Sequence, residues 1–76
     1  MNKIIEELLG KDIIRFQNGI YYINDGYFIM VKDEYYGDLL LMSAIYMDGD
    51  DVCVCDNMLH SYVVNNISDL TISKAI

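Results

Sequence analysis

Hydrophobic residues follow a helical spacing only at the start of the chain. Four of them share one face of a helix: Ile4, Ile5, Leu8 and Leu9. Asn2 precedes this stretch and can cap the first free N–H groups, and Gly10 follows it as the residue expected just past a helix end. The pattern therefore predicts a short helix within residues 1–10.

From residue 11 onward the hydrophobic residues alternate with a period of two. Asn18-Gly19 and Asp25-Gly26 match the type I′ hairpin turn, in which both central residues need a positive φ. These two dipeptides bracket the apolar run IYYIN and are flanked by DIIRFQ and YFIMVK. We expect a three-strand antiparallel meander over residues 11–33.

The segment from Asp38 to Gly49 is compatible with two structures. Asp38 can cap a helix rich in Leu and Met, and Gly49 can end it. Asp48-Gly49 followed by DDVCVC instead indicates a hairpin turn into a β-branched strand, which favours a strand over residues 39–47. The C-terminal residues 57–76 then supply the strand LHSYVV and a last short strand, LTIS, which is expected to pair with a sheet edge.

These elements predict an α+β fold in a single domain, residues 1–76. A short N-terminal helix is followed by a mainly antiparallel meander of five to seven short strands, as a small open barrel or a helix-covered sheet. In YFIMVK both faces are apolar, with Ile29 on one face and Phe28 and Met30 on the other. One short helix covers little, so a homodimer is an alternative way to cover the second face.

Charge is distributed unevenly along the chain, whose formal net charge is −7. An acidic segment, residues 34–56 with the adjoining Asp33, contains no Lys or Arg, whereas acids and bases balance elsewhere. Nucleic acids and anionic membranes need neutralising cations, so we expect no direct binding to either. The segment favours a basic protein surface as the partner.

Localisation and redox state follow from two further features. Glu6 and Glu7 interrupt the N-terminal apolar run, so it lacks a signal-peptide core, and no hydrophobic stretch is long enough to span a bilayer. Cys53 and Cys55 are too close in sequence for an ordinary disulfide. These features indicate the cytoplasm as the expected location.

Candidate chemistry is weak. The run Cys53, Cys55, Asp56 and His60 has ligand types for zinc, but its C-x-C spacing differs from a zinc knuckle. MDGDDV has its glycine in the wrong place for an EF-hand loop. Cys55 and His60 lack any sign of an oxyanion hole or cleft. We therefore expect no metal, no cofactor and no enzymatic activity.

Seven tyrosines are present, and most coincide with predicted strands, where tyrosine is common. Tyr35-Tyr36 differs because it lies in the charged loop KDEYYGD, which indicates an exposed recognition pair. Eight residues are the predicted partner-binding set: Asp33, Glu34, Tyr35, Tyr36, Asp38, Asp48, Asp50 and Asp51.

Two functions are compatible with these features. The first is a small acidic inhibitor or binding module whose carboxylates imitate phosphates and whose tyrosines occupy the places of stacked bases. In size, acidity and composition the whole chain resembles phage-encoded inhibitors, including anti-CRISPR proteins; the likeness includes no motif and transfers no residue role. The second is a homo-oligomeric structural or regulatory small barrel without mimicry.

Overall fold

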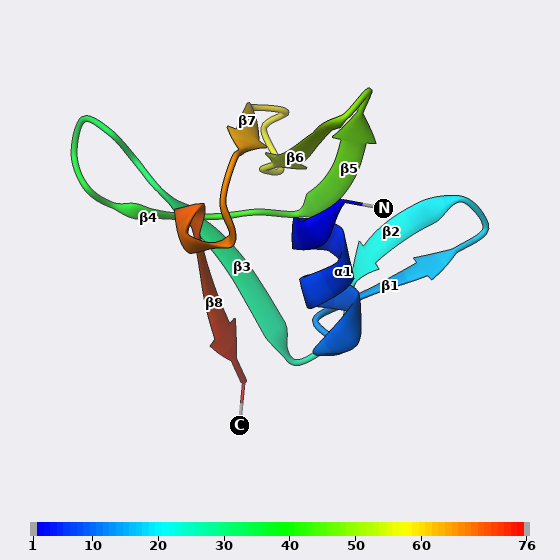
Figure 1. The fold of residues 1–76 in the computed structure, drawn as a ribbon. Helices are drawn as coiled ribbons and strands as arrows, with labels where there is room; N and C mark the ends of the chain where they lie inside the picture. The colour runs from blue at the N-terminus through cyan, green and yellow to red at the C-terminus, as the bar shows by residue number, and fades with distance from the viewer. Residues whose placement is uncertain (1, 76) are drawn as a thin grey trace.

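The computed structural model describes residues 2–75, which contain an α-helix, a short 3-10 helix and eight β-strands (Figure 1). In chain order the elements are α1 Lys3–Gly10, β1 Ile14–Gln17, β2 Ile20–Ile23, β3 Tyr27–Lys32, β4 Leu39–Leu41, β5 Ala44–Asp48, β6 Asp51–Cys55, β7 Ser61–Val64, η1 Ile67–Asp69 and β8 Leu70–Lys74. The predicted α+β class is confirmed, with eight strands in place of five to seven. Residues 39–47 contain no helix, and the favoured strand is present as two strands, β4 and most of β5, with residues 42–43 between them.

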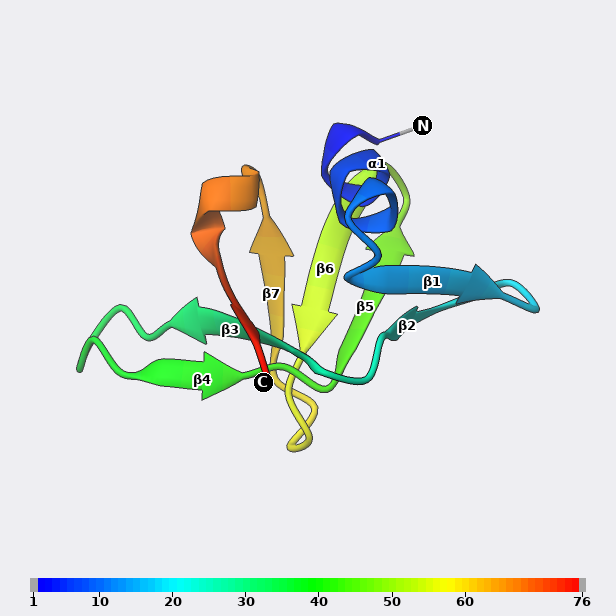
Figure 2. The same cartoon turned by 90° about the horizontal axis from the view of Figure 1, so that it is seen from below.

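The strands form three small antiparallel sheets: the hairpin β1–β2, the sheet β4–β3–β8 and the sheet β5–β6–β7. Only residues 24–26 separate β2 from β3, and only residues 42–43 separate β4 from β5. The chain therefore passes from one sheet to the next at two bends. Figure 2 shows the β3–β4 and β1–β2 hairpins extending in opposite directions from the sheet of β5, β6 and β7. The resulting barrel is open.

The turn at Asn18-Gly19 is confirmed as a two-residue hairpin. Gln17 pairs with Ile20, and both turn residues have a positive φ, 53° and 80°. These values are typical of the type I′ turn, whose twist matches that of the flanking strands.

The turn at Asp25-Gly26 is present, but it does not connect paired strands. β2 pairs with β1, whereas β3 pairs with β4 and β8, so the predicted three-strand meander over residues 11–33 is wrong at this point. The N–H of Tyr27 donates to Asn24 O at 3.2 Å, and of the two central residues only Gly26 has a positive φ, 90°. This geometry is typical of a type II turn, which redirects the chain.

The predicted hairpin after β5 is also confirmed, with its turn shifted by one residue. Asp48 pairs with Asp51, which leaves Gly49 and Asp50 as the central residues. Gly49 has a φ of 60°, as a glycine at the first central position of a type II′ turn requires.

Helix α1 begins as predicted and ends at Gly10, one residue later than predicted. Asn2 Oδ1 accepts the N–H of Ile4 at 2.8 Å. Gly10 is the last helical residue, and the left-handed residue is Asp12, with a φ of 57°. The N–H of Asp12 donates to Leu9 O and that of Ile13 to Leu8 O, which together form a Schellman motif.

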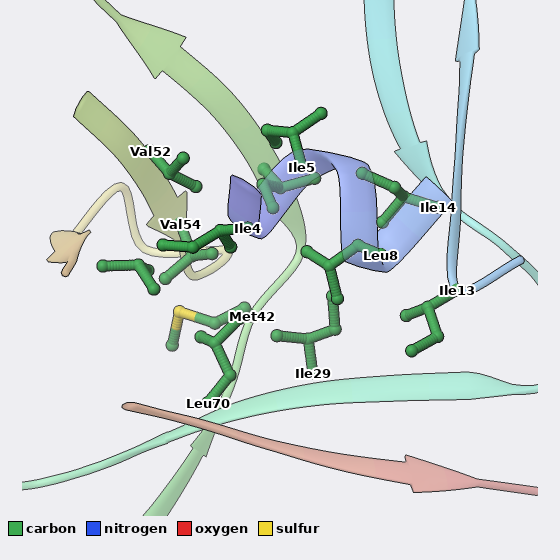
Figure 3. Close-up of a cluster of buried hydrophobic side chains, with 12 residues drawn as sticks. Ile4, Ile5, Leu8, Ile13, Ile14, Ile29, Met42, Val52, Val54 and Leu70 are labelled. Atoms are coloured by element: carbon green, nitrogen blue, oxygen red, sulfur yellow. The ribbon is translucent and has the colours of Figure 1, made fainter. Parts of the chain in front are cut away.

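The hydrophobic core lies between α1 and the sheets (Figure 3). Ile5 and Leu8 of the helix are 1% and 0% exposed, and Ile29 of β3 is also fully buried. Val52 and Val54 bring the inner face of β6 against the helix. The helix thus fills the interior of the open barrel, and the outer faces of the sheets remain uncovered by it. No helix in residues 2–75 is long and apolar enough to cross a membrane.

Candidate functional site

The β3–β4 loop, residues 33–38, presents the two unexplained tyrosines. Tyr35 and Tyr36 are 90% and 85% exposed, more than any other large hydrophobic residue in residues 2–75. Both lie at the far end of the β3–β4 hairpin, which extends away from the core (Figures 1 and 2). The structure therefore places the predicted recognition pair at a protruding tip.

Three hydrogen bonds donated by backbone N–H groups lie within the loop. The N–H of Asp33 donates to Asp38 O at 2.7 Å, and the N–H of Gly37 donates to Asp33 O at 3.0 Å. Asp33 Oδ2 accepts the N–H of Tyr36 at 3.0 Å. Gly37 has a φ of 73°, and a Cβ there would lie 3.5 Å from Lys32 Cε. The loop thus presents Tyr35 and Tyr36 on an ordered backbone.

Carboxylates surround this tyrosine pair. Asp33, Glu34 and Asp38 belong to the same loop, and Glu34 and Asp38 are exposed. Lys32, at the end of β3, is the basic residue beside them in sequence. The tip therefore joins two aromatic side chains to a locally negative charge.

Asp48, Asp50 and Asp51 lie elsewhere on the molecule. They occupy the β5–β6 turn, and all three are exposed. Figures 1 and 2 both show this turn well separated from the β3–β4 loop. The eight predicted partner-binding residues thus form two groups, five on the loop and three on the β5–β6 turn.

The outer face of the sheet β4–β3–β8 is apolar and exposed. Leu41 pairs with Met30 and Leu39 with Lys32, so these side chains share one face with Phe28. Phe28, Leu39 and Leu41 are 45%, 52% and 55% exposed. Both faces of β3 were expected to be apolar, but the predicted partner-binding set contains no residue of this face. The available signal in the sequence was the run of three leucines at residues 39–41, which places apolar side chains on both faces of a strand.

The outer face of β5–β6–β7 carries the two cysteines, because Val52 and Val54 face the core. Cys53 is opposed by Tyr46 and Val63 on the neighbouring strands and is 3% exposed. Burial, followed by the negative charges of Asp48 and Asp51, raises the pKa of the Cys53 thiol above its ordinary value of 9.0. Cys53 is therefore a protonated thiol at neutral pH and a poor nucleophile.

Asp56 organises the loop between β6 and β7. Its Oδ1 accepts the N–H groups of Met58 and His60, both at 2.9 Å. Its Oδ2 lies 3.3 Å from Nδ1 of His60. The backbone N–H of His60 is the main cause that lowers the pKa of Asp56 below its ordinary value of 3.8. The role of this carboxylate is to order the loop.

The cysteine–histidine chemistry considered from sequence has no geometry to support it. The thiol of Cys55 donates to the backbone oxygen of Asp56 at 3.3 Å, whereas the imidazole of His60 lies against the Asp56 carboxylate. Within residues 2–75, no three His, Cys, Asp or Glu side chains come together in a way that could hold a metal ion. The surface features of the described chain are thus aromatic, apolar and acidic.

A groove of about 740 Å³, which no sequence pattern predicted, lies between β7 and the start of the β3–β4 loop. Tyr35 and Glu34 line one side, and Tyr62 and Asp69 line the other. Its walls come from segments about thirty residues apart in sequence. A local sequence pattern cannot predict that two such segments lie side by side.

Comparisons with known proteins add no assignment to this geometry. No protein-family model matches the chain, and no curated protein and no solved structure matches it either.

Proposed function

We propose that this chain is a small acidic protein-binding module that docks on a basic surface of a partner protein. The observation that carries the proposal is the tip of the β3–β4 hairpin, where Tyr35 and Tyr36 are almost fully exposed on a hydrogen-bonded loop. Large exposed aromatic residues on an ordered backbone are typical anchors of protein interfaces, because they bury area at a low entropic cost.

The acidic residues define the chemistry of the partner. Asp33, Glu34 and Asp38 adjoin the tyrosines, and the β5–β6 turn adds a second negative group. Charges at the rim of an interface accelerate encounter with an oppositely charged surface. A partner surface rich in Lys and Arg fits both groups.

Nucleic-acid mimicry is the particular form of this function that we favour. Surfaces that bind nucleic acid are basic and often place aromatic contacts beside phosphate contacts. Carboxylates at two separate turns can take the places of phosphates, and Tyr35 and Tyr36 can take those of bases. An inhibitor of this kind, as in phage-encoded anti-CRISPR proteins, competes with nucleic acid and does not bind it.

Competition with nucleic acid tests the proposal. The chain is immobilised, exposed to a cell lysate from its source organism, and washed with duplex DNA. We expect a basic protein to be captured, displaced by the DNA, and lost when Tyr35 and Tyr36 are both changed to Ala. The matched control is the double variant Met58→Ala and Leu59→Ala, which removes two exposed apolar side chains, 72% and 83% exposed, from the β6–β7 loop. Capture that survives both DNA and the tyrosine change would contradict the proposal.

Binding kinetics then separate the two groups of residues. Changing Asp48, Asp50 and Asp51 to Asn should slow association and reduce its salt dependence, because these charges act at long range. The tyrosine double variant should instead speed dissociation, at a cost of about 1–4 kcal/mol in binding free energy. Equal kinetics for wild type and both variants would place the interface outside these two groups.

The outer face of β4–β3–β8 favours a second candidate, a homo-oligomeric module without mimicry. Phe28, Leu39 and Leu41 are half exposed on one sheet face, which a second copy could cover. Light scattering after size-exclusion chromatography tests it: a stable dimer that dissociates on Leu39→Ser and Leu41→Ser supports this candidate. A monomer at all concentrations removes it.

A further inference from the structure

The groove between β7 and the β3–β4 loop has an unpaired strand on one side. β7 pairs with β6 through one edge, and within residues 2–75 its other edge pairs with no strand. Figure 2 shows β6 on one side of β7, and η1, β8 and the β3–β4 hairpin on the other. Tyr62 and Val63 of β7 line the groove. Backbone N–H and C=O groups alternate in direction along a strand, so half of those in β7 point away from β6.

Such an edge is a template for an added strand. An extended peptide that lies beside it gains main-chain hydrogen bonds from the edge and side-chain contacts from the groove. The walls of the groove offer both apolar and aromatic contacts, from Val31, Tyr35 and Tyr62. The side chains of an added strand alternate between its two faces, so every second side chain of the peptide could contact these residues.

The negative charge of the groove favours a positively charged peptide. Three carboxylates line the groove, those of Asp33, Glu34 and Asp69, against the single ammonium of Lys32. One oxygen each of Asp33 and Asp69 accepts backbone N–H groups of the chain itself, which leaves their other oxygens available. Glu34 makes no hydrogen bond or ion pair within the described residues. The groove therefore fits Lys or Arg side chains, and a second copy of this acidic chain fits it poorly.

We propose that the groove binds an extended basic segment of a partner protein, which adds to β7 as a further strand. Apolar side chains of the segment contact Val31 and Tyr62, and its alternate Lys or Arg side chains lie against Asp33, Glu34 and Asp69. The inference rests on the proposed function, since it gives the basic partner a particular structure and a particular place.

A synthetic peptide of alternating valine and lysine, blocked at both ends, is the probe. We expect it to shift the amide resonances of Ser61–Val64 and to slow hydrogen exchange of the amides that face away from β6. A peptide of the same sequence with N-methyl groups on alternate amides cannot donate those hydrogen bonds. Loss of two such bonds should weaken binding about thirtyfold.

A charge variant adds a matched comparison. Glu34→Gln should weaken binding of the peptide about two- to fivefold, the range of an exposed ion pair. Glu6→Gln, at an exposed position of α1, removes the same charge away from the groove and should leave the affinity unchanged. An equal loss in both variants would mean attraction by net charge only, and would overturn the site.

Three other outcomes also overturn the inference. The first is that the peptide does not bind to the protein. The second is that the peptide shifts only the resonances of the β5–β6 turn. The third is that the β7 amides are already protected from hydrogen exchange in a dimer of the protein without peptide. If the peptide fails but DNA still displaces a basic partner through Tyr35 and Tyr36, the proposed function stands and only the strand addition is wrong. If the peptide binds as expected and no partner depends on the tyrosines, the groove stands and the proposed function is wrong.

Discussion

The backbones of Asp56 and His60 are tied together from both sides. The carboxylate of Asp56 accepts the N–H of His60 at 2.9 Å, and the N–H of Asp56 donates to His60 O at 3.0 Å. The residues between them include Leu59, whose φ of 67° is a costly conformation for a bulky side chain. Asp56 therefore stabilises a conformation that the loop sequence alone disfavours.

Acid should weaken this loop. Because the folded pKa of Asp56 lies below its ordinary value of 3.8, the carboxylate stabilises the fold above its unfolded pKa. That contribution is lost as the pH falls through the folded pKa. We expect the urea midpoint of wild type to fall more than that of Asp56→Asn between neutral pH and about pH 3. Parallel curves for the two proteins would show that the carboxylate contributes nothing.

Replacing Gly10 should stabilise the protein. Gly10 is helical, and a Cβ there would have no neighbour within 4 Å. Gly10→Ala should therefore raise the free energy of unfolding by about 0.5–1 kcal/mol, because alanine loses less entropy on forming a helix. Gly19→Ala is the matched control and should destabilise the protein, since Gly19 has a φ of 80°. A destabilised Gly10→Ala variant would mean that Gly10 ends the helix, as the sequence had indicated.

Shortening a helix side chain that lies in the core should lower the stability of the protein. Leu8 is fully buried beneath the sheets, and Leu8→Ala should lower the free energy of unfolding by about 2–5 kcal/mol. Leu59→Ala removes the same atoms from a side chain that is 83% exposed. Its effect should stay within about 0.5 kcal/mol. Urea denaturation monitored by tyrosine fluorescence measures both, and similar losses would contradict this core.

The two cysteines should differ in reactivity. Cys53 is buried with a raised pKa, whereas Cys55 is partly exposed. Iodoacetamide should therefore label Cys55 first in the native protein, because both access and thiolate formation are restricted at Cys53. Mass spectrometry of proteolytic fragments follows the two rates, and labelling in urea provides the control in which the rates converge. Faster native labelling of Cys53 would place that thiol on an open surface.

Local sequence patterns predicted the elements of this fold well where one turn or cap determines the structure. Asn18-Gly19 specified its hairpin because Asn and Gly both adopt a positive φ readily, as the type I′ turn requires. Asp25-Gly26 has the same type of sequence, yet the chain bends there into another sheet. Pairing of β3 with β8 is a long-range contact, and no dipeptide encodes it.

The candidate site was predicted in part for the same reason. Tyr35 and Tyr36 were found because no strand periodicity explained them, and their exposure agrees with that prediction. Asp48, Asp50 and Asp51 were grouped with them by distance in sequence, which does not measure distance in space. The contribution of Asp69 and Tyr62 to the groove depends on how β7 and η1 lie against β3, which only the tertiary structure determines.

The open barrel leaves β7 and β8 as short outer strands, each unpaired along one side within residues 2–75. Exposed edges invite pairing between copies of a chain, and this risk is greatest when molecules are concentrated. A net charge of −7 on 76 residues opposes such encounters, because like-charged molecules repel one another before their edges can meet. The repulsion disappears near pH 4.2, where the net charge vanishes. The acidity that we propose to suit a basic partner would thus also oppose pairing between these edges at neutral pH.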